Sequence, residues 1–228
     1  HLSASKGVEE ERSDLALRLQ LLELESTISQ ANELSVVARQ AMIDANRELR
    51  ERTRYLEDLS VTDDLTGLFN RRYFRLRVVE EEARATRQDA DLMLMLIDID
   101  HFKAINDSHS HTVGDAVLKE FGALLTKAFR ETDVVARWGG EEFAVLLPGF
   151  CRESAAAVAE RARKMVEDHD WTASGPDLSL TVSIGIAGLA EVVPLASKQG
   201  AGRYEALFEL ADARLYEAKR QGRNRVVT

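Results

Sequence analysis

The chain has one cysteine among its 228 residues, so it cannot form a disulfide within itself. A lone cysteine fits a reducing compartment such as the cytoplasm, and we expect Cys151 to be a bystander thiol in a predicted loop. Long apolar runs are missing too: no stretch approaches the roughly 18 consecutive apolar residues that a membrane-spanning helix needs. We therefore expect no membrane segment in these residues.

Basic residues are outnumbered, with 30 Lys and Arg against 39 Asp and Glu, which gives a net charge of −9. An extended surface for a nucleic acid polymer is therefore not expected. A nucleotide would need a metal ion and local Arg or Lys side chains to bind. The first residue is His1 rather than Met, so we expect residues 1–7 to be a cloning remnant or flexible start, with an upstream sensor domain or membrane anchor missing.

Proline and glycine are both absent between Val8 and Ser60, where apolar residues recur at alternating steps of four and three. This heptad pattern predicts a coiled-coil helix over residues 8–60. Its a positions would be Leu21, Ile28, Ser35, Met42, Leu49 and Leu56. The small and polar residues near the middle weaken the seam, so it suits either a signalling helix that shifts register or a plain dimerisation rod.

Residues 61–228 form the second predicted unit, after a hinge at 60–66. We expect helices near 70–87, 116–129, 153–168 and 204–220, with Phe74, Val78 and Val79 of the first facing inward. Strands are expected at 91–100, on both sides of a hairpin at 139–142, at 178–187 and at 225–227, and residues 101–115 as a helical turn and a loop. This order predicts an α+β domain with a mostly antiparallel central sheet flanked by helices.

Two acidic segments of this unit suggest chemistry. The buried strand ends in Asp98 and Asp100, and Glu141 and Glu142 follow the pair Gly139-Gly140. Two glycines accept positive φ at both turn positions and leave no Cβ between the turn and a ligand. Neighbouring strand residues face opposite ways, so the two glutamates should have different roles. If their strands are neighbours, Asp98 and Glu142 converge into an oxygen site suited to Mg²⁺. A solvated hairpin tip and a strand-end cap are the plainer alternatives.

Five segments carry a family resemblance: DLTGLFNRR at 64–72, DIDHFKAIND at 98–107, HTVGD at 111–115, GGEEF at 139–143 and LYEAKRQGRN at 215–224. In this order they resemble the GGDEF family of diguanylate cyclases, in its GGEEF variant, over about residues 63–227. The resemblance implies a palm-like domain in a bacterial cytoplasm that condenses two GTP into cyclic di-GMP and two pyrophosphates.

The resemblance also implies residue roles. Asp98, Glu142 and the Ile99 carbonyl would hold two Mg²⁺ ions per site, or Mn²⁺ instead, and Glu141 would help deprotonate the 3′-hydroxyl. Substrate contacts would come from Asn106 and Asp115 at guanine, from His101, Phe102, Lys103, Lys219 and Arg223 at the phosphates, and from Gly139 and Gly140 beside the nucleoside. A carboxylate at Asp115 selects guanine because it accepts hydrogen bonds from N1–H and N2–H₂.

A further implication is product inhibition. Arg130-Glu131-Thr132-Asp133 fits the family's R-x-x-D site for cyclic di-GMP, with Arg161 as a second arginine and Arg84 supplied by a neighbouring domain; a helix-end ion pair is the plainer reading. Each domain holds one GTP, so the reaction requires two domains face to face. We therefore expect a parallel homodimer joined by the coiled coil.

The sequence departs from the family at Ser110, where glycine is usual, and at His101, which replaces a common phenylalanine. If the backbone at residue 110 needs positive φ, serine costs on the order of 1 kcal/mol. His101, His109 and His111 are interpreted as loop histidines rather than a zinc site.

The alternatives to a cyclase of this kind are a catalytically silent domain that senses GTP or cyclic di-GMP, a cyclase for a mixed or adenine dinucleotide, and a passive dimerisation scaffold. Asp98, Glu141, Glu142 and Lys219 argue against the silent domain, and Asp115 argues against an adenine substrate.

Overall fold

The computed structural model describes residues 21, 38–49, 52, 60–192 and 203–228. The chain divides into two compact units, residues 1–59 and 60–228. In the first unit residues 38–49 are helical and exposed, and Met42 and Leu49 present 68% and 63% of their surface. These are two of the predicted seam positions, while Ile28, Ser35 and Leu56 lie outside the described residues. The coiled coil thus stays a prediction.

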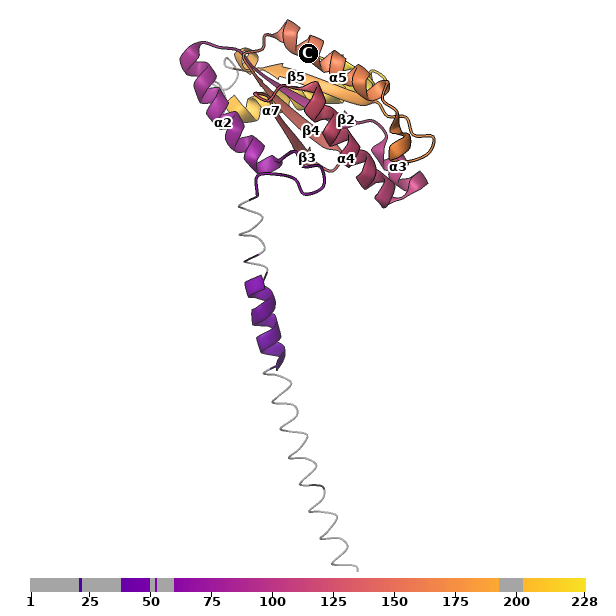
Figure 1. The fold of residues 1–228 in the computed structure, drawn as a ribbon. Coiled ribbons are helices and arrows are strands. Elements are labelled where there is room, and N and C mark those ends of the chain that lie inside the picture. Colours follow the sequence, from indigo (N-terminus) through magenta and orange to yellow (C-terminus); the bar gives the residue numbers. More distant parts are fainter. Residues whose placement is uncertain (1–20, 22–37, 50–51, 53–59, 193–202) are drawn as a thin grey trace, which may run out of the picture. The chain divides into compact units, whose positions relative to one another are not determined.

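The described part of the second unit contains one six-stranded sheet (Figure 1). Its strands are β1 (Phe69–Asn70), β2 (Leu92–Ile99), β3 (Val134–Gly139), β4 (Glu142–Pro148), β5 (Val182–Gly188) and β6 (Val226–Val227). They lie in the order β1-β3-β4-β2-β5-β6. The four central strands pair antiparallel, and the two short edge strands pair parallel with their neighbours. The predicted α+β fold with a mostly antiparallel sheet is confirmed.

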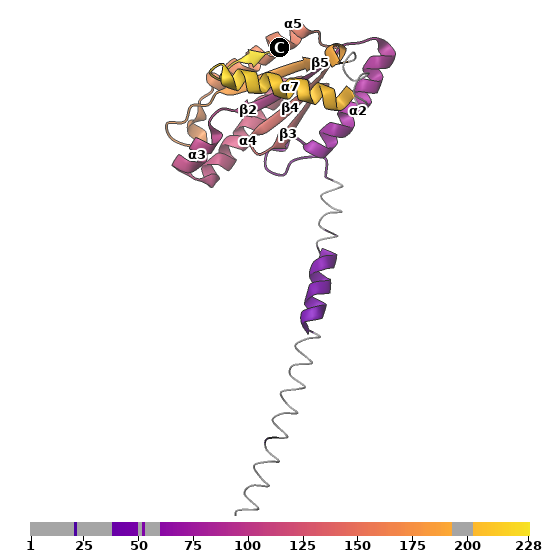
Figure 2. The same cartoon turned by 180° about the vertical axis from the view of Figure 1, so that it is seen from behind.

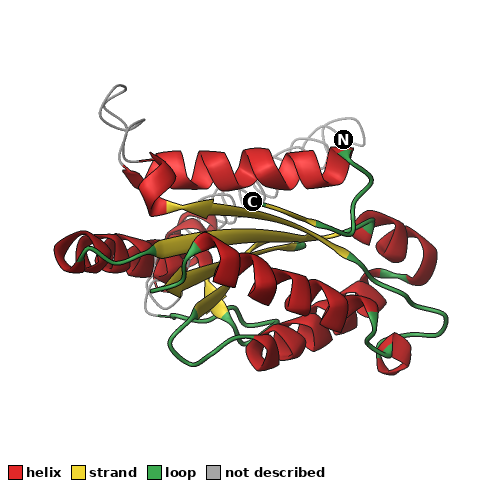
Figure 3. Ribbon diagram, turned by 90° about the horizontal axis from the view of Figure 1, so that it is seen from above, coloured by secondary structure: helices red, strands yellow, loops and turns green. Residues whose placement is uncertain are grey.

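Helices cover both faces of this sheet (Figures 2 and 3). On one face lie α2 (Arg71–Gln88) and α7 (Arg203–Arg220), and on the other α4 (His111–Ala128) and α5 (Arg152–Glu167). The short α3 (Phe102–His109) follows β2, and a 3₁₀ turn η1 (Trp171–Ala173) follows α5. Because strand side chains alternate, Met93, Met95 and Ile97 pack towards α4 and α5, while Leu94 and Leu96 pack towards α2 and α7. A strand buried on both faces explains the continuous apolar run.

Apart from the hairpin turn described below, three expectations for this unit were wrong. Residues 102–109 and 111–115 are helical, because Phe102 is buried under α4 and draws a polar segment into regular structure. Val79 is 58% exposed, since Phe74 and Val78 already fill the contact with the sheet. Strand β5 begins only at Val182, after a turn at residues 171–181. In the described residues no helix has both the length and the apolar character needed to cross a membrane.

Candidate active site at the ends of the central strands

The two acidic segments meet where β2 ends and β4 begins. The antiparallel register places Asp98 directly opposite Glu142, and Ser183 of β5 lies opposite Asp98 on the other side. Directly opposed residues of an antiparallel pair have Cβ atoms about 5 Å apart. The Nζ of Lys219, near the end of α7, lies 2.8 Å from Asp98 Oδ2. Segments separated by more than a hundred residues therefore assemble one charged site.

Burial shapes the electrostatics of Asp98, whose residue is 7% exposed. Burial raises the pKa of Asp98, Glu141 and Glu142 add to the rise by repulsion, and the Lys219 ammonium opposes it. Two neighbouring carboxylates repel the ionised form of Asp98, and one lysine only partly offsets them. A bound divalent cation would therefore stabilise the ionised form. The site is thus poised for a cation.

The hairpin between β3 and β4 turns at Gly140-Glu141, one residue later than the Gly139-Gly140 turn that we predicted. Only Gly140 has positive φ, at 49°, because a bulge between Arg137 and Gly139 shifts the register and leaves Gly139 in β3. No atom lies within 4 Å of where a Cβ would stand on either glycine. The glycine surface is therefore open to a ligand. The Glu141 carbonyl accepts a hydrogen bond from Ile99 N, at 3.3 Å, which joins the turn to the end of β2.

The side chain of Arg137 stabilises the turn through hydrogen bonds to its backbone. Its Nε and Nη2 donate to the Gly140 carbonyl at 3.0 and 2.9 Å, and its Nη1 donates to Asp63 Oδ1 at 3.2 Å. Asp63 also accepts from the backbone and side chain of Thr66. Burial alone would raise the pKa of Asp63, but the bonds from Thr66 and the charge of Arg137 outweigh it and lower the pKa. Sequence reasoning missed this contact, although an arginine two residues before a Gly-Gly turn was its available signal.

The helices α3 and α4 form the polar wall beside this edge. Asn106 is half-buried on α3, and Asp115 is exposed in the first turns of α4. A Cβ on Gly114 would stand 2.0 Å from Asn106 Oδ1 and 3.3 Å from the Phe102 ring, so this glycine leaves room between the two helices for both side chains. His101 has φ of 58° and Phe102 starts α3, so the first backbone N–H groups of that helix have no partner inside it. Lys103 is exposed in the same turn.

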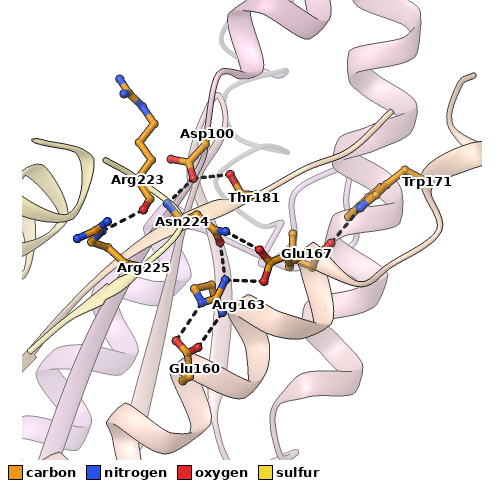
Figure 4. A network of polar contacts seen from close by, with 10 residues as sticks. Asp100, Glu160, Arg163, Glu167, Trp171, Thr181, Arg223, Asn224 and Arg225 are labelled. Carbon is orange, nitrogen blue, oxygen red and sulfur yellow. Dashed lines mark hydrogen bonds and ion pairs between the residues drawn. The ribbon is translucent and has the colours of Figure 1, made fainter. Parts of the chain in front are cut away.

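The last helix brings the basic residues. The helix α7 packs closely against the sheet because Gly185 of β5 has no side chain at the contact. A Cβ there would stand 2.2 Å from the Ala211 carbonyl oxygen. Lys219 therefore reaches Asp98, and the chain then reverses through Gly222, Arg223 and Asn224. The side chain of Arg223 extends away from the polar contacts around Asn224 (Figure 4).

The predicted inhibitory residues gather elsewhere. Asp133 is 6% exposed, and its Oδ2 accepts from Arg130 N at 2.9 Å, while its buried Oδ1 has no hydrogen-bond partner in the described residues. Burial raises the pKa of Asp133, against the hydrogen bond and charge of Arg130. Arg161 donates to the Ala128 carbonyl at 2.6 Å, next to this turn. Arg84 instead pairs with Glu81 on α2, beside an open pocket of about 450 Å³ that Thr132 also lines.

The donor atoms at this edge are oxygens, which suit a divalent cation. The described residues contain no group of three or more His, Cys, Asp or Glu side chains placed to hold a metal. Two carboxylates and the Ile99 carbonyl are nevertheless an all-oxygen set of the kind that binds Mg²⁺ through few protein ligands and leaves coordination places for phosphates. The cation would also relieve the repulsion around Asp98.

The fold and this edge define a class: an α+β domain whose central strands end in paired carboxylates beside a glycine turn. Residues 60–225 match the family described as "Diguanylate cyclase, GGDEF domain". The chain therefore belongs to the GGDEF family, as the motifs predicted.

Individual relatives agree with this assignment. The chain is 43% identical over 175 residues to diguanylate cyclase DgcP of Pseudomonas aeruginosa, which covers 75% of this chain and 25% of the relative. The crystal structure of the coiled coil and GGDEF domain of DgcB from Caulobacter crescentus, in complex with c-di-GMP, is 32% identical with a TM-score of 0.65, covering 85% of this chain and 98% of that one. The active GGEEF domain of a Vibrio cholerae diguanylate cyclase is 31% identical with a TM-score of 0.61, covering 69% and 95%. The chain spans less than half of the length of its most similar curated relatives, between 25% and 46%.

Proposed function

We propose that the chain is a diguanylate cyclase that condenses two GTP into cyclic di-GMP. The observation that carries the proposal is the register that sets Asp98 opposite Glu142, with Lys219 at 2.8 Å from Asp98. Family membership and the similarity to named diguanylate cyclases support the same reaction. GTP is a nucleotide of the cytoplasm, which is the compartment that we propose.

We propose that Asp98, Glu142 and the Ile99 carbonyl hold two Mg²⁺ ions, with Mn²⁺ as an alternative. When bound, such ions neutralise triphosphate charge and lower the pKa of a coordinated hydroxyl. The buried, repelled carboxylate of Asp98 supports this assignment.

The chain's own side chains bind and orient the nucleotide. Asn106 and Asp115 face guanine from α3 and α4, and the first N–H groups of α3, around His101 and Phe102, meet phosphate oxygens. Lys103, Lys219 and Arg223 neutralise the triphosphate, and Gly139 and Gly140 let the nucleoside lie against the turn. Glu141 stands next to the carboxylate pair and accepts the proton of the 3′-hydroxyl.

Two domains complete the reaction. The 3′-oxygen of one GTP attacks the α-phosphorus of the other, the bond to pyrophosphate breaks, and the proton leaves to Glu141 or water. The same exchange in the opposite direction closes the ring. One domain presents only one such edge, so we propose a homodimer through residues 8–60.

Product inhibition would act at the separate cluster of Arg130, Asp133 and Arg161. An arginine fork matches O6 and N7 of guanine, and a carboxylate such as that of Asp133 accepts hydrogen bonds from its N–H groups. Arg84 would come from a neighbouring domain, since within this domain it pairs with Glu81. We propose that cyclic di-GMP bound here holds two domains apart.

Product analysis by chromatography tests the proposal. With GTP and Mg²⁺ the wild type should yield cyclic di-GMP and pyrophosphate in a 1:2 ratio, Glu142→Ala should yield neither, and Glu205→Ala on the exposed face of α7 should match the wild type. GTP binding without pyrophosphate release from a proven dimer would instead identify a nucleotide sensor.

A further inference from the structure

Asp100 is a buried carboxylate that no step of the proposed reaction uses. It is 5% exposed and follows β2 directly, two residues beyond Asp98. It accepts three hydrogen bonds: from Ser183 Oγ at 2.7 Å, from Thr181 Oγ1 at 2.8 Å and from the backbone N–H of Asn224 at 3.0 Å. The first two come from β5 and the residue before it, and the third comes from the turn after α7. Asp100 therefore connects the end of β2 to the turn that contains Arg223, a residue predicted to bind phosphate.

The side chain of Asn224 connects the same turn to α5 (Figure 4). Its Nδ2 donates to Glu167 at 2.6 Å, and its Oδ1 accepts from Arg163 Nη1 at 2.5 Å. Arg163 is itself 7% exposed and is held by Glu160 and Glu167. The turn is thus fixed from two sides by charge-assisted hydrogen bonds, which are the strong kind.

This fixation maintains a backbone that the sequence alone disfavours. Gly222, Arg223 and Asn224 have φ of 115°, 62° and 47°. Glycine adopts such values freely and asparagine tolerates them, but arginine does not. A strained residue persists only where its surroundings over-determine it, and such residues gather at functional sites. Here the surroundings are the Ala218 carbonyl, which accepts from Arg223 N, the Asp100 carboxylate, which accepts from Asn224 N, and the Arg223 carbonyl, which accepts from Arg225 Nε, at 3.0 Å each.

We propose that Asp100, together with Asn224, is a positioning residue that sets the Arg223 side chain at the phosphates of the bound triphosphate. Its place two residues after Asp98 means that one strand end fixes both the carboxylate of the cation site and the turn that presents Arg223. The distance between the cation and the arginine is then set by a short piece of rigid chain. This inference rests on the proposed function, because it names what holds one part of that site.

A purely structural role for Asp100 predicts a different pattern of losses. If Asp100 only stabilised the fold, replacing it would lower the affinity for every ligand equally. If Asp100 positions Arg223, replacing it affects only the contacts that Arg223 makes. The guanine contacts on α3 and α4 do not involve the turn. Phosphate-dependent affinity should therefore fall while guanine affinity stays.

The test is calorimetric titration, with Mg²⁺, of the α,β-methylene analogue of GTP and of guanosine, which carries no phosphate. Asp100→Ala should weaken binding of the analogue by about tenfold, the value of one charge-assisted phosphate contact, and leave guanosine binding unchanged. Asp100→Asn keeps one carbonyl that can still accept from Asn224 N, so it should be intermediate. Asn224→Gly keeps the left-handed backbone and loses the bridge to α5, and it carries the test if Asp100→Ala does not fold. Asp212→Ala, an exposed carboxylate of α7, is the matched control and should change neither affinity.

A double-mutant cycle with Arg223→Ala decides whether Asp100 acts through the arginine. If it does, Asp100→Ala causes no further loss once Arg223 is removed. Losses that multiply, or a fall in guanosine affinity equal to that of the analogue, would overturn the inference while leaving the proposed cyclase activity intact. A wild type that binds no analogue would instead overturn the proposed function.

Discussion

At the scale of single residues, Ser110 is a position where the backbone conformation is strained. Its φ and ψ are 133° and 162°, a region that glycine alone adopts readily. Its side chain caps α4 weakly, through Val113 N at 3.5 Å. Ser110→Gly should therefore raise the free energy of unfolding by about 1 kcal/mol, measured by urea denaturation, because relief of strain exceeds the lost cap. Ser108→Gly within α3 should lower it by up to about 1 kcal/mol. Equal effects at both positions would contradict the strain.

Asp98 carries a second prediction at this scale, because its ionised form destabilises the metal-free domain. Its pKa is raised on folding, so the folded protein binds a proton more tightly than the unfolded chain. Stability in chelator should thus fall as the pH rises through the window between the ordinary carboxyl pKa and the raised one, and stay lower above it. Asp98→Asn should raise the melting temperature at neutral pH in chelator and abolish turnover.

Two measurements check this prediction. Asp91→Asn, an exposed carboxyl at the start of β2, should change neither property. In the wild type, the Mg²⁺ concentration for half-maximal rate should rise as the pH falls through the raised pKa, because a proton competes with the cation. A lower melting temperature for Asp98→Asn would show that the ion pair with Lys219 outweighs burial.

At the scale of elements, the sequence predicted β2 well and the segment after it poorly. A strand that is buried on both faces needs apolar residues at nearly every position, so β2 could be recognised from its unbroken apolar run. Helical periodicity predicted the ends of α5 and α7 to within one residue. The helix α3 is mostly polar, and its position depends on Phe102, which is buried against α4, and on Gly114, which leaves room for Asn106. These are tertiary contacts, and local propensity does not report them.

The candidate site shows the same division. Its candidate residues could be proposed from the sequence because carboxylates, glycines and basic side chains in this order suggest metal and phosphate binding. Its supporting contacts could not, because they join distant segments: Arg137 meets Asp63 across 74 residues of sequence, and Asp100 meets Asn224 across 124.

The strand β3 and the segment before β1 form one such supported element, in which Arg137 joins Asp63 to the Gly140 turn. Both partners are largely shielded, at 16% and 24% side-chain exposure. Arg137→Gln should lower the free energy of unfolding by about 2 kcal/mol at pH 7, as expected for hydrogen bonds to a charged group. The pKa of Asp63 is lowered on folding, so its contribution is present above the ordinary carboxyl pKa and is lost as the pH falls through the lowered one.

A double-mutant cycle with Asp63→Asn should show coupling of this pair at pH 7 in denaturant titrations. Arg87→Gln, on the exposed end of α2, should change stability by less than about 0.5 kcal/mol. Full additivity of Arg137→Gln and Asp63→Asn would show that the two side chains do not support each other.

At the scale of the whole molecule, the proposed reaction requires two copies of the 60–228 domain, and residues 8–60 are predicted to join them. In the part of the chain that the structure describes, both hydrophobic clusters are made of residues of this domain, so a chain that starts at Ser60 should fold. The truncated chain should bind the GTP analogue as the full chain does. Its turnover per domain should rise in proportion to protein concentration, because each productive encounter is bimolecular, whereas turnover of the full chain should not depend on concentration. Light scattering run beside the assay gives the oligomeric state.

Fusing the domain to an unrelated parallel two-stranded coiled coil should restore concentration-independent turnover. The restored rate should vary with the helical phase of the junction if the coiled coil sets the angle between the two domains. Equal, concentration-independent rates in a monomeric truncated chain and the full chain would leave the predicted coiled coil without a part in catalysis.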